Sequence, residues 1–272
     1  MKKVMRTALT IAGSDSIGGA GLQADIKAMG SLGVHATCVV TAVTAQNTHT
    51  VSDIYPMPLE LIEAQFNSIL EDCKIDAIKT GMLYSPEITK LVAERLEYHE
   101  SPIIVDPVLI AGVGGSLAGD GLTEAVKRYL MPLCDLITPN KYEAEALSGI
   151  EINNEDDAIR VCEVLGKDGS AIYLKGGHMD TENVVDYLYI DKRLERIEYP
   201  RLRKSGHGSG CTLSSYITAN CAKGLDMITS VRNSRVLIQR SIATQYAIGE
   251  GDEVINTIIC DSDESDDSDI LQ

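Results

Sequence analysis

Residues 8–43 read ALTIAGSDSIGGAGLQADIKAMGSLGVHATCVVTAV, and their pattern is the clearest indication of the fold. A short apolar run at residues 8–12 is followed by a glycine-rich segment, a stretch of helical character, and a second apolar run at residues 37–43. Both runs are apolar at successive positions, which is typical of strands covered by helices on both faces of a sheet. The stretch therefore predicts a strand–helix–strand unit of a parallel sheet.

The same alternation continues along most of the chain. Further short apolar runs predict strands at residues 76–79, 103–105, 136–138 and 171–174. Between the runs, apolar residues recur at helical spacing, as in Ile62, Phe66, Ile69 and Leu70, and later in Ile238, Ile242 and Tyr246. Residues 184–190 and 195–199 look instead like an antiparallel hairpin with a four-residue connection. This order predicts an α/β fold with a mainly parallel sheet between helices.

The composition argues against nucleic acid and membranes as partners. The 272 residues include 40 Asp and Glu against 24 Lys and Arg, a formal net charge of -16, which repels phosphate backbones. No apolar run approaches the roughly 20 residues of a membrane helix, and the start of the chain lacks the apolar stretch of a signal peptide. The 7 cysteines show no Cys-x-x-Cys spacing, so neither a disulfide framework nor a thiolate zinc site is indicated. We expect a cytoplasmic protein with reduced thiols.

A single domain is expected over residues 1–260, because no Pro- or Ser-rich linker divides this part of the chain. Residues 261–269 read DSDESDDSD. This segment lacks the apolar residues that would offset the entropy of ordering it. We expect residues 261–272 to form a disordered acidic tail.

Ligands of open parallel sheets bind beyond the carboxyl ends of the strands, so the residues that follow each predicted strand are candidates for a site. One segment after the hairpin also qualifies, Gly206-His207-Gly208-Ser209-Gly210-Cys211-Thr212. Its alternate glycines let the backbone turn its amides inward, and a helix that begins near Cys211 or Thr212 would add its positive end. We interpret this segment as an anion cradle rather than as a simple turn before a helix. The phosphate-loop motif with Gly-Lys-Ser/Thr is absent from the sequence.

Three other segments could contribute polar groups, and each has a structural alternative. Asp106 either caps the loop after its strand or holds Mg²⁺ through water molecules. Asn140 and Glu143 have the spacing of a capping box, and both could also face a metal-bound nucleotide. Lys175 lies between a predicted strand and a pair of glycines, where its side chain either stays solvated or reaches a phosphate as a point charge.

The glycine-rich segment near the N-terminus gives a weaker signal. Gly18, Gly19 and Gly21 lead into a helix without the GxGxxG spacing of dinucleotide-binding proteins. By residue type, Asp25 is expected to be a solvated helix residue, and Gln46 is only a polar residue after a strand.

Taken together, these segments resemble the hydroxymethylpyrimidine/phosphomethylpyrimidine kinases of thiamine biosynthesis, in the ribokinase-like superfamily. The resemblance rests on seven collinear stretches between residues 8 and 215: ALTIAGSDSIGGAGLQADIKAMGSLGVHA, TAVTAQNT, IKTGMLYS, IVDPVLIAGVGGSL, LITPNKYEAEALSG, LKGGH and GHGSGCTLSS. It implies a ribokinase-like three-layer α-β-α sandwich with a mainly parallel central sheet. It also implies transfer of the γ-phosphoryl group of MgATP to a hydroxymethylpyrimidine and then to its monophosphate.

The resemblance implies roles for individual residues, with ATP and Mg²⁺ as cofactors. The residues implied in catalysis are Gly208, Ser209, Gly210 and Cys211. The residues implied in binding are Asp106 and Glu143 for the metal, Asn140, Lys175 and Gly177 for the nucleotide, and Gly13, Asp25, Gln46 and Met82 for the pyrimidine. Gln46 suits this role because a carboxamide presents an acceptor and a donor side by side, which matches an aminopyrimidine edge. Relatives often form dimers, so a homodimer is also implied.

Cys211 stands where sugar kinases of this superfamily have an Asp that acts as a base. A thiol at a helix N-terminus is expected to have a lowered pKa. We hypothesise that a carboxylate at this position would repel the phosphate that is the nucleophile of the second transfer. The chain departs from the usual family pattern at Ser209, where Thr is common, and at residues 248–256, where a Gly-Pro-Val run is more frequent.

Two alternative functions stay open. Close relatives of this branch phosphorylate pyridoxal, but Gln46 and the complete TAQNT run favour an aminopyrimidine. A non-catalytic paralogue that binds a thiamine precursor would be expected to have lost the cradle, Asp106 or Lys175, and the sequence retains all three.

Overall fold

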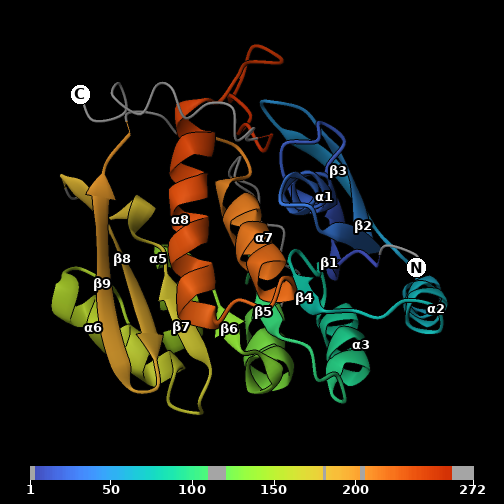
Figure 1. The fold of residues 1–272 in the computed structure, drawn as a ribbon, viewed down its shortest axis with the longest axis horizontal. Coiled ribbons are helices and arrows are strands. Elements are labelled where there is room, and N and C mark those ends of the chain that lie inside the picture. The colour runs from blue at the N-terminus through green and yellow to red at the C-terminus, as the bar shows by residue number, and fades with distance from the viewer. Residues whose placement is uncertain (1–3, 110–120, 180–181, 203–205, 259–272) are drawn as a thin grey trace.

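A computed structural model describes residues 4–109, 121–179, 182–202 and 206–258. A nine-stranded sheet runs through it in the order β3-β2-β1-β4-β5-β6-β7-β8-β9 (Figure 1). The strands are β1 (Thr7–Ser14), β2 (His35–Gln46), β3 (Val51–Pro56), β4 (Ala77–Thr80), β5 (Ile103–Val105), β6 (Leu136–Ile137), β7 (Ala171–Leu174), β8 (Asn183–Ile190) and β9 (Arg193–Pro200). Neighbours from β2 to β7 pair in parallel, whereas β3, β8 and β9 each pair antiparallel with the strand before them in the chain.

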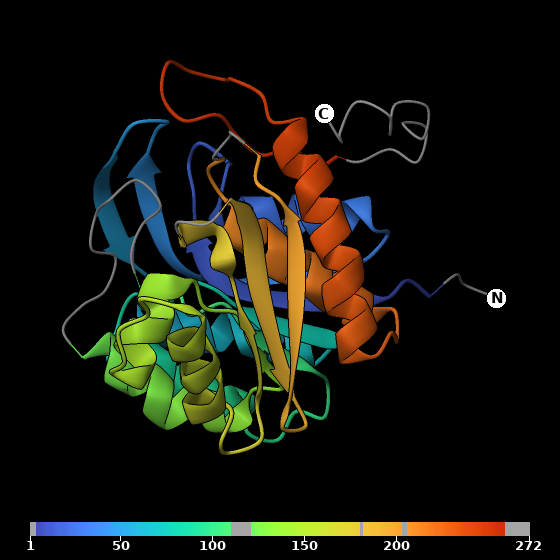
Figure 2. The same ribbon diagram turned by 90° about the vertical axis from the view of Figure 1, so that its left-hand side faces the viewer.

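Helices cover both faces of the sheet (Figures 1 and 2). One face carries α1 (Gly21–Ser31), α7 (Ser209–Ala222) and α8 (Met227–Ala243). The other carries α2 (Leu59–Leu70), α3 (Pro86–Leu96), α5 (Lys141–Ser148) and α6 (Glu155–Leu165), with the short α4 (Leu122–Ala125) beside them. This arrangement confirms the three-layer α/β sandwich that the sequence predicted.

Successive side chains of the central strands enter two different cores. In β5, Ile103 and Val105 pack with residues of α2, α3 and α6, whereas Ile104 packs with residues of α7 and α8. The alternation follows from the two-residue period of a strand, and burial on both sides requires apolar residues at every position. The continuous apolar runs in the sequence therefore reflect two cores rather than one.

The structure corrects several local predictions. The hairpin connection comprises only Asp191 and Lys192, with φ of 50° and 61°. A two-residue turn with positive φ at both positions matches the twist of its strands, so the predicted four-residue connection is wrong. Helix α8 ends at Ala243, and Tyr246 lies beyond it, where it bridges to Val254. The strand β3 was not predicted, because Ser52 and Asp53 interrupt its apolar residues and no continuous apolar run results.

Helix α7 begins at Ser209, earlier than the sequence predicted, and brings its N-terminus to the carboxyl edge of the parallel strands. None of the helices that the structure describes is long and apolar enough to cross a membrane. The predicted acidic tail, residues 261–272, lies outside the described residues. The single domain over residues 1–260 stays a prediction.

Candidate active site

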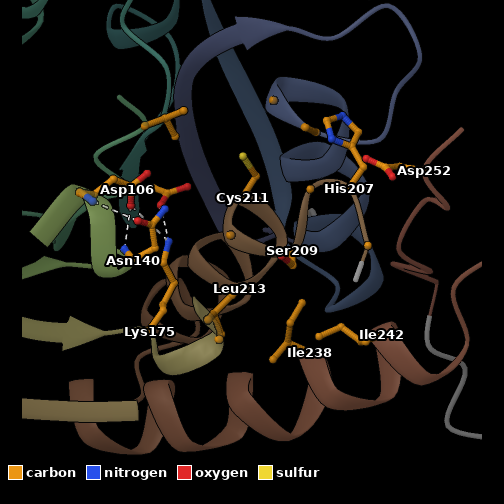
Figure 3. Close-up of a pocket in the computed structure, with 18 of the residues that line it drawn as sticks. Asp106, Asn140, Lys175, His207, Ser209, Cys211, Leu213, Ile238, Ile242 and Asp252 are labelled. Atoms are coloured by element: carbon orange, nitrogen blue, oxygen red, sulfur yellow. Dashed lines mark hydrogen bonds and ion pairs between the residues drawn. The ribbon is translucent and has the colours of Figure 1, made fainter. Parts of the chain in front are cut away.

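A cavity of about 580 Å³ opens at the carboxyl edge of the sheet (Figure 3). It is lined by twelve of the thirteen predicted site residues, namely Gly13, Gln46, Met82, Asp106, Asn140, Glu143, Lys175, Gly177, Gly208, Ser209, Gly210 and Cys211. The exception is Asp25. Parallel strands bring their carboxyl ends to one edge, which is why residues that are far apart in sequence meet here.

The loop at Gly208 and the first turn of α7 line part of the cavity with backbone amides. Gly208 precedes the first turn of α7 with a φ of 89°, a left-handed conformation that favours glycine. A Cβ at Gly208 would lie 1.8 Å from the carbonyl oxygen of Gly19, so the two loops are in backbone contact. The Thr212 amide donates to the Gly208 carbonyl at 2.9 Å as the first bond of the helix. The preceding amides of Ser209 to Cys211 belong to a first turn, which has no acceptors inside its own helix. Amides in this position at a helix N-terminus can bind an anion.

A buried pair of opposite charges lies beside these amides. Lys175 Nζ is 3.1 Å from Asp106 Oδ1 and 3.9 Å from Glu143 Oε2, and its side chain is only 14 % exposed. The solvated-lysine alternative is therefore wrong. A Cβ at Gly210 would lie 3.2 Å from Lys175 Nζ, so the glycine lets the amides of the cradle approach this charge closely. Burial raises the pKa of the Asp106 carboxyl, but Lys175 and Lys79 outweigh it and hold the pKa below its usual value.

The capping interpretation of Asn140 and Glu143 is confirmed. The Glu143 amide donates to Asn140 Oδ1 at 3.0 Å, and the Asn140 amide donates to Glu143 Oε2 at 2.7 Å. Both residues also line the cavity. Burial raises the pKa of Glu143 to about 7, with Lys175 opposing the rise and Asp106 adding to it. Asn140 and Glu143 therefore cap α5 and line the cavity at the same time.

The carboxylate oxygen atoms of Asp106 and Glu143 suit a hard cation. Among the described residues, no hydrogen-bond donor reaches the buried Asp106 Oδ2. Mg²⁺ usually takes one or two carboxylates and completes its shell with water or phosphate oxygens. The part of the chain that the structure describes has no cluster of three or more His, Cys, Asp or Glu that could hold a metal. Asp106, with Glu143 close by, fits the sparse type of site.

The thiol of Cys211 does not have the expected properties. It lies in the first turn of α7, at the centre of the cavity (Figure 3). Burial raises its pKa to about 12, and the opposing effects of Lys79 and of the Gly21 amide are too small to reverse the shift. The prediction of a lowered pKa is therefore wrong, because desolvation outweighs the helix N-terminus. The thiol is neutral at physiological pH.

Asp25 is neither solvated nor part of the cavity wall. Its carboxylate is fully buried next to the site and forms an ion pair with the equally buried Lys79 at 2.7 Å. Hydroxyl groups of Thr10 and Ser215 donate to it at 2.5 and 2.7 Å. Sequence reasoning missed Lys79, although a lysine inside the apolar strand β4 was a signal that it must have a buried partner.

The cavity has two chemically different ends. Lys175 lies at one end of the cavity and His207 at the other, polar end, with Cys211 between them, and Leu213, Ile238 and Ile242 form an apolar wall below Cys211 (Figure 3). At that polar end, a Cβ on Gly13 would lie 2.2 Å from Met82 Cε, so the missing side chain makes room for Met82. Gln46 also lies at this end, where its side chain contacts His207.

Sequence reasoning also missed two polar residues at this end, His207 and Asp15. Both line the cavity, and they contact each other across 192 positions of sequence. The position of His207 inside the glycine-rich segment was the available signal.

An amide cradle, a lysine–carboxylate pair and a polar pocket on one cavity define a class of enzyme, the kinases that phosphorylate small molecules. The fold agrees with this class. The pyridoxal kinase from Staphylococcus aureus in complex with ADP is similar with a TM-score of 0.87 and 30 % identity, over 94 % of each chain. The phosphomethylpyrimidine kinase from Clostridium difficile is similar with a TM-score of 0.78 and 39 % identity, over 87 % of this chain and 99 % of that one.

Sequence comparison defines the family. The phosphomethylpyrimidine kinase family matches residues 15–256. The hydroxymethylpyrimidine/phosphomethylpyrimidine kinase of Bacillus subtilis is 40 % identical over 248 residues, which are 90 % of this chain and 92 % of that protein. A thiamine biosynthesis bifunctional protein of Geobacter sulfurreducens is 38 % identical over 95 % of this chain and 53 % of its own length. The chain belongs to the phosphomethylpyrimidine kinase family.

Proposed function

We propose that this protein transfers the γ-phosphoryl group of MgATP to 4-amino-5-hydroxymethyl-2-methylpyrimidine and then to the resulting monophosphate. The observation that carries the proposal is one cavity lined together by the amide cradle, by the Lys175–Asp106 pair, by an apolar wall and by Gln46. The names of the relatives support the same substrate pair.

The nucleotide half of the cavity supplies charge neutralisation. The amides of Ser209 to Cys211 hold the transferring phosphate, and Lys175 adds a positive charge next to them. The wall at Ile238 offers an apolar surface to the nucleobase. Phosphoryl transfer has a loose transition state, so positioning and electrostatic stabilisation account for most of the catalysis. Bound Mg²⁺ would neutralise phosphate oxygens, and Asp106 and Glu143 would hold it directly or through water.

The end of the cavity at Gln46, which would bind the phosphoryl acceptor, orients the pyrimidine but provides no catalytic base. Gln46 offers an acceptor and a donor to the aminopyrimidine edge. The Cys211 thiol, with a pKa of about 12, is protonated at neutral pH and so does not remove a proton from the acceptor. The second transfer needs no base, because its nucleophile is an oxygen of a phosphate that is already ionised.

The alternative acceptor is pyridoxal. The Staphylococcus aureus pyridoxal kinase in complex with AMP-PCP and pyridoxal is similar to this chain with a TM-score of 0.85 and 29 % identity. The higher sequence identity to hydroxymethylpyrimidine/phosphomethylpyrimidine kinases favours the aminopyrimidine. The assembled cradle and the Lys175–Asp106 pair argue against a non-catalytic binding protein.

The test is a product analysis with purified protein, MgATP and hydroxymethylpyrimidine, followed over time by mass spectrometry, with pyridoxal in parallel. We expect the monophosphate first and the diphosphate later. The matched control is Lys175→Met, which should lower both rates at least a hundredfold and so assign the products to this site. Formation of pyridoxal phosphate alone would overturn the substrate, and binding without any product would favour the non-catalytic alternative. Dimerisation and a cytoplasmic location stay predictions.

A further inference from the structure

Three side chains from distant parts of the chain meet at one nitrogen atom. His207 Nε2 lies 3.1 Å from Asp15 Oδ2 and 2.9 Å from the side-chain amide of Gln46. The side chains of His207 and Asp15 are only 8 % and 4 % exposed. The contact is thus largely buried, although both residues also line the cavity.

Asp15 determines which of the three groups donates. Its carboxylate accepts the backbone amides of Ile17 at 3.0 Å, Gly19 at 3.0 Å and Ala20 at 2.8 Å. Three backbone amides that donate to one carboxyl group favour its ionised form. An ionised carboxylate can only accept hydrogen bonds. The proton of the His207–Asp15 contact therefore resides on His207 Nε2.

This proton determines the orientation of Gln46. Nε2 has a single N–H, which Asp15 and the facing atom of Gln46 share, and a second donor only 2.9 Å away would repel it. The Gln46 atom that faces Nε2 must therefore be the carboxamide oxygen. A half-turn of the carboxamide places its oxygen instead of its nitrogen next to His207 Nε2 without changing the shape of the side chain. The half-turn also suits Thr44, whose hydroxyl donates to the Ser14 carbonyl at 3.0 Å and so presents a lone pair to the Gln46 side chain.

We propose that His207, held by Asp15, is a positioning residue that fixes the polarity of the Gln46 carboxamide and thereby the direction in which the acceptor ring lies. This inference rests on the proposed function. In the aminopyrimidine, the amine stands between a ring nitrogen and the carbon that bears the hydroxymethyl group. A carboxamide with its oxygen on the His207 side receives the amine on that side and the ring nitrogen on the other.

The polarity matters because it places the reacting group. With the amine on the His207 side, the adjacent hydroxymethyl group lies on the same side, and the loop that carries His207 continues directly into the cradle at Gly208. With the opposite polarity, the ring would bind turned over, and its hydroxymethyl group would point away from that loop. The backbone of His207 is also fixed in place, because its amide donates to the Glu253 carbonyl at 3.0 Å. The segment at residues 248–256, where the chain departs from the usual family pattern, therefore supports this contact.

The test is a double-mutant cycle with His207→Phe and Gln46→Met, each assayed for KM and kcat with hydroxymethylpyrimidine and with ATP. His207→Phe keeps a ring but loses the donor, so we expect KM for the pyrimidine to rise about tenfold. KM for ATP should change less than twofold. In the Gln46→Met background the same substitution should change KM for the pyrimidine less than twofold, because the group on which His207 acts is gone. His207→Gln, which keeps an N–H donor, should restore much of the loss.

Two outcomes of the cycle would overturn the inference. If the effects of His207→Phe and Gln46→Met are additive, His207 does not act through Gln46. If KM for ATP rises as much as KM for the pyrimidine, the substitution has only disturbed the neighbouring cradle.

A second measurement separates this inference from the proposed function. Nitrogen-15 NMR of the ligand-free protein reports the protonated ring nitrogen of His207 without any substrate. We expect a proton on Nε2, and Asp15→Asn should alter this signal. A ring protonated only on Nδ1 would refute the inference even if the enzyme phosphorylates the pyrimidine. If the wild-type protein does not phosphorylate it, the proposed function fails, and the NMR signal still decides whether His207 is a donor.

Discussion

Lys79 Nζ lies 2.7 and 2.8 Å from the two carboxylate oxygens of Asp25, and neither side chain is exposed to solvent. The pair joins β4 to α1 next to the cavity, and Ser215 of α7 donates a further hydrogen bond to Asp25. Burial disfavours the charge on Lys79, but Asp25 outweighs it and raises the pKa of the ammonium group above its usual value. Lys79 therefore stays positively charged throughout the physiological pH range.

Removal of one partner of this pair should be strongly destabilising. We expect Lys79→Met to lower the free energy of unfolding in urea by about 3–5 kcal/mol, because it leaves a buried carboxylate without its cation. The double variant Lys79→Met with Asp25→Asn should lose less than Lys79→Met alone, since the uncompensated charge is also removed. The control is Lys90→Met, which breaks an exposed pair with Glu94 and should have little effect. A similar loss in both lysine variants would contradict the argument.

Two glycines with the same φ allow the cost of backbone strain to be measured separately from the cost of a steric clash. Gly208 and Gly224 both have a φ of 89°, but only Gly208 would place a Cβ 1.8 Å from a backbone atom, the oxygen of Gly19. A Cβ at Gly224 would have no described atom within 4 Å. Gly224→Ala should cost about 1 kcal/mol for its left-handed backbone and leave KM for ATP unchanged. Gly208→Ala should lower the melting temperature further and raise KM for ATP at least tenfold, because the loops of the cradle must separate. Equal effects would show that the contact is unimportant.

The thiol of Cys211 should react slowly with alkylating reagents. Its raised pKa of about 12 means that only about one thiolate in ten thousand thiols is present at pH 8. We expect the rate of carbamidomethylation, followed by peptide mass spectrometry, to keep rising through pH 10. In urea the same cysteine should approach its plateau near the ordinary thiol pKa of about 8.5. A plateau below pH 9 in the folded protein would show that Cys211 is activated rather than desolvated.

A carboxylate at position 211 should affect the two transfers differently. In Cys211→Asp, we expect the second phosphorylation to fall at least tenfold more than the first, because the added charge repels the phosphate of the monophosphate substrate. Cys211→Ser adds no charge and should lower both steps by similar factors. The rates are obtained from separate assays that start from hydroxymethylpyrimidine and from its monophosphate. Equal losses of both steps in Cys211→Asp would refute the electrostatic hypothesis.

Local sequence patterns determined much of this fold. The apolar runs at residues 103–105 and 171–174 are strands with the predicted bounds. Asn140 and Glu143 form the capping box that their spacing predicted. These features depend on the preferences of neighbouring residues along one segment, and such preferences are present in the sequence itself. The same reasoning explains why β3 was missed, since it lies at the edge of the sheet and has no fully buried residue.

The α/β architecture, the edge of the sheet that carries the cavity and twelve of the residues that line this cavity were predictable from the amino-acid sequence. The burial and pairing of the charged and polar side chains became apparent only in the folded structure. Asp25 is buried rather than solvated because Lys79 pairs with it from another element, and the pKa of Cys211 is raised because burial disfavours the thiolate. Asp15 and His207 meet across 192 positions of sequence. Desolvation and charge pairing depend on which segments the sheet order brings together, and no pattern within a single segment contains that information.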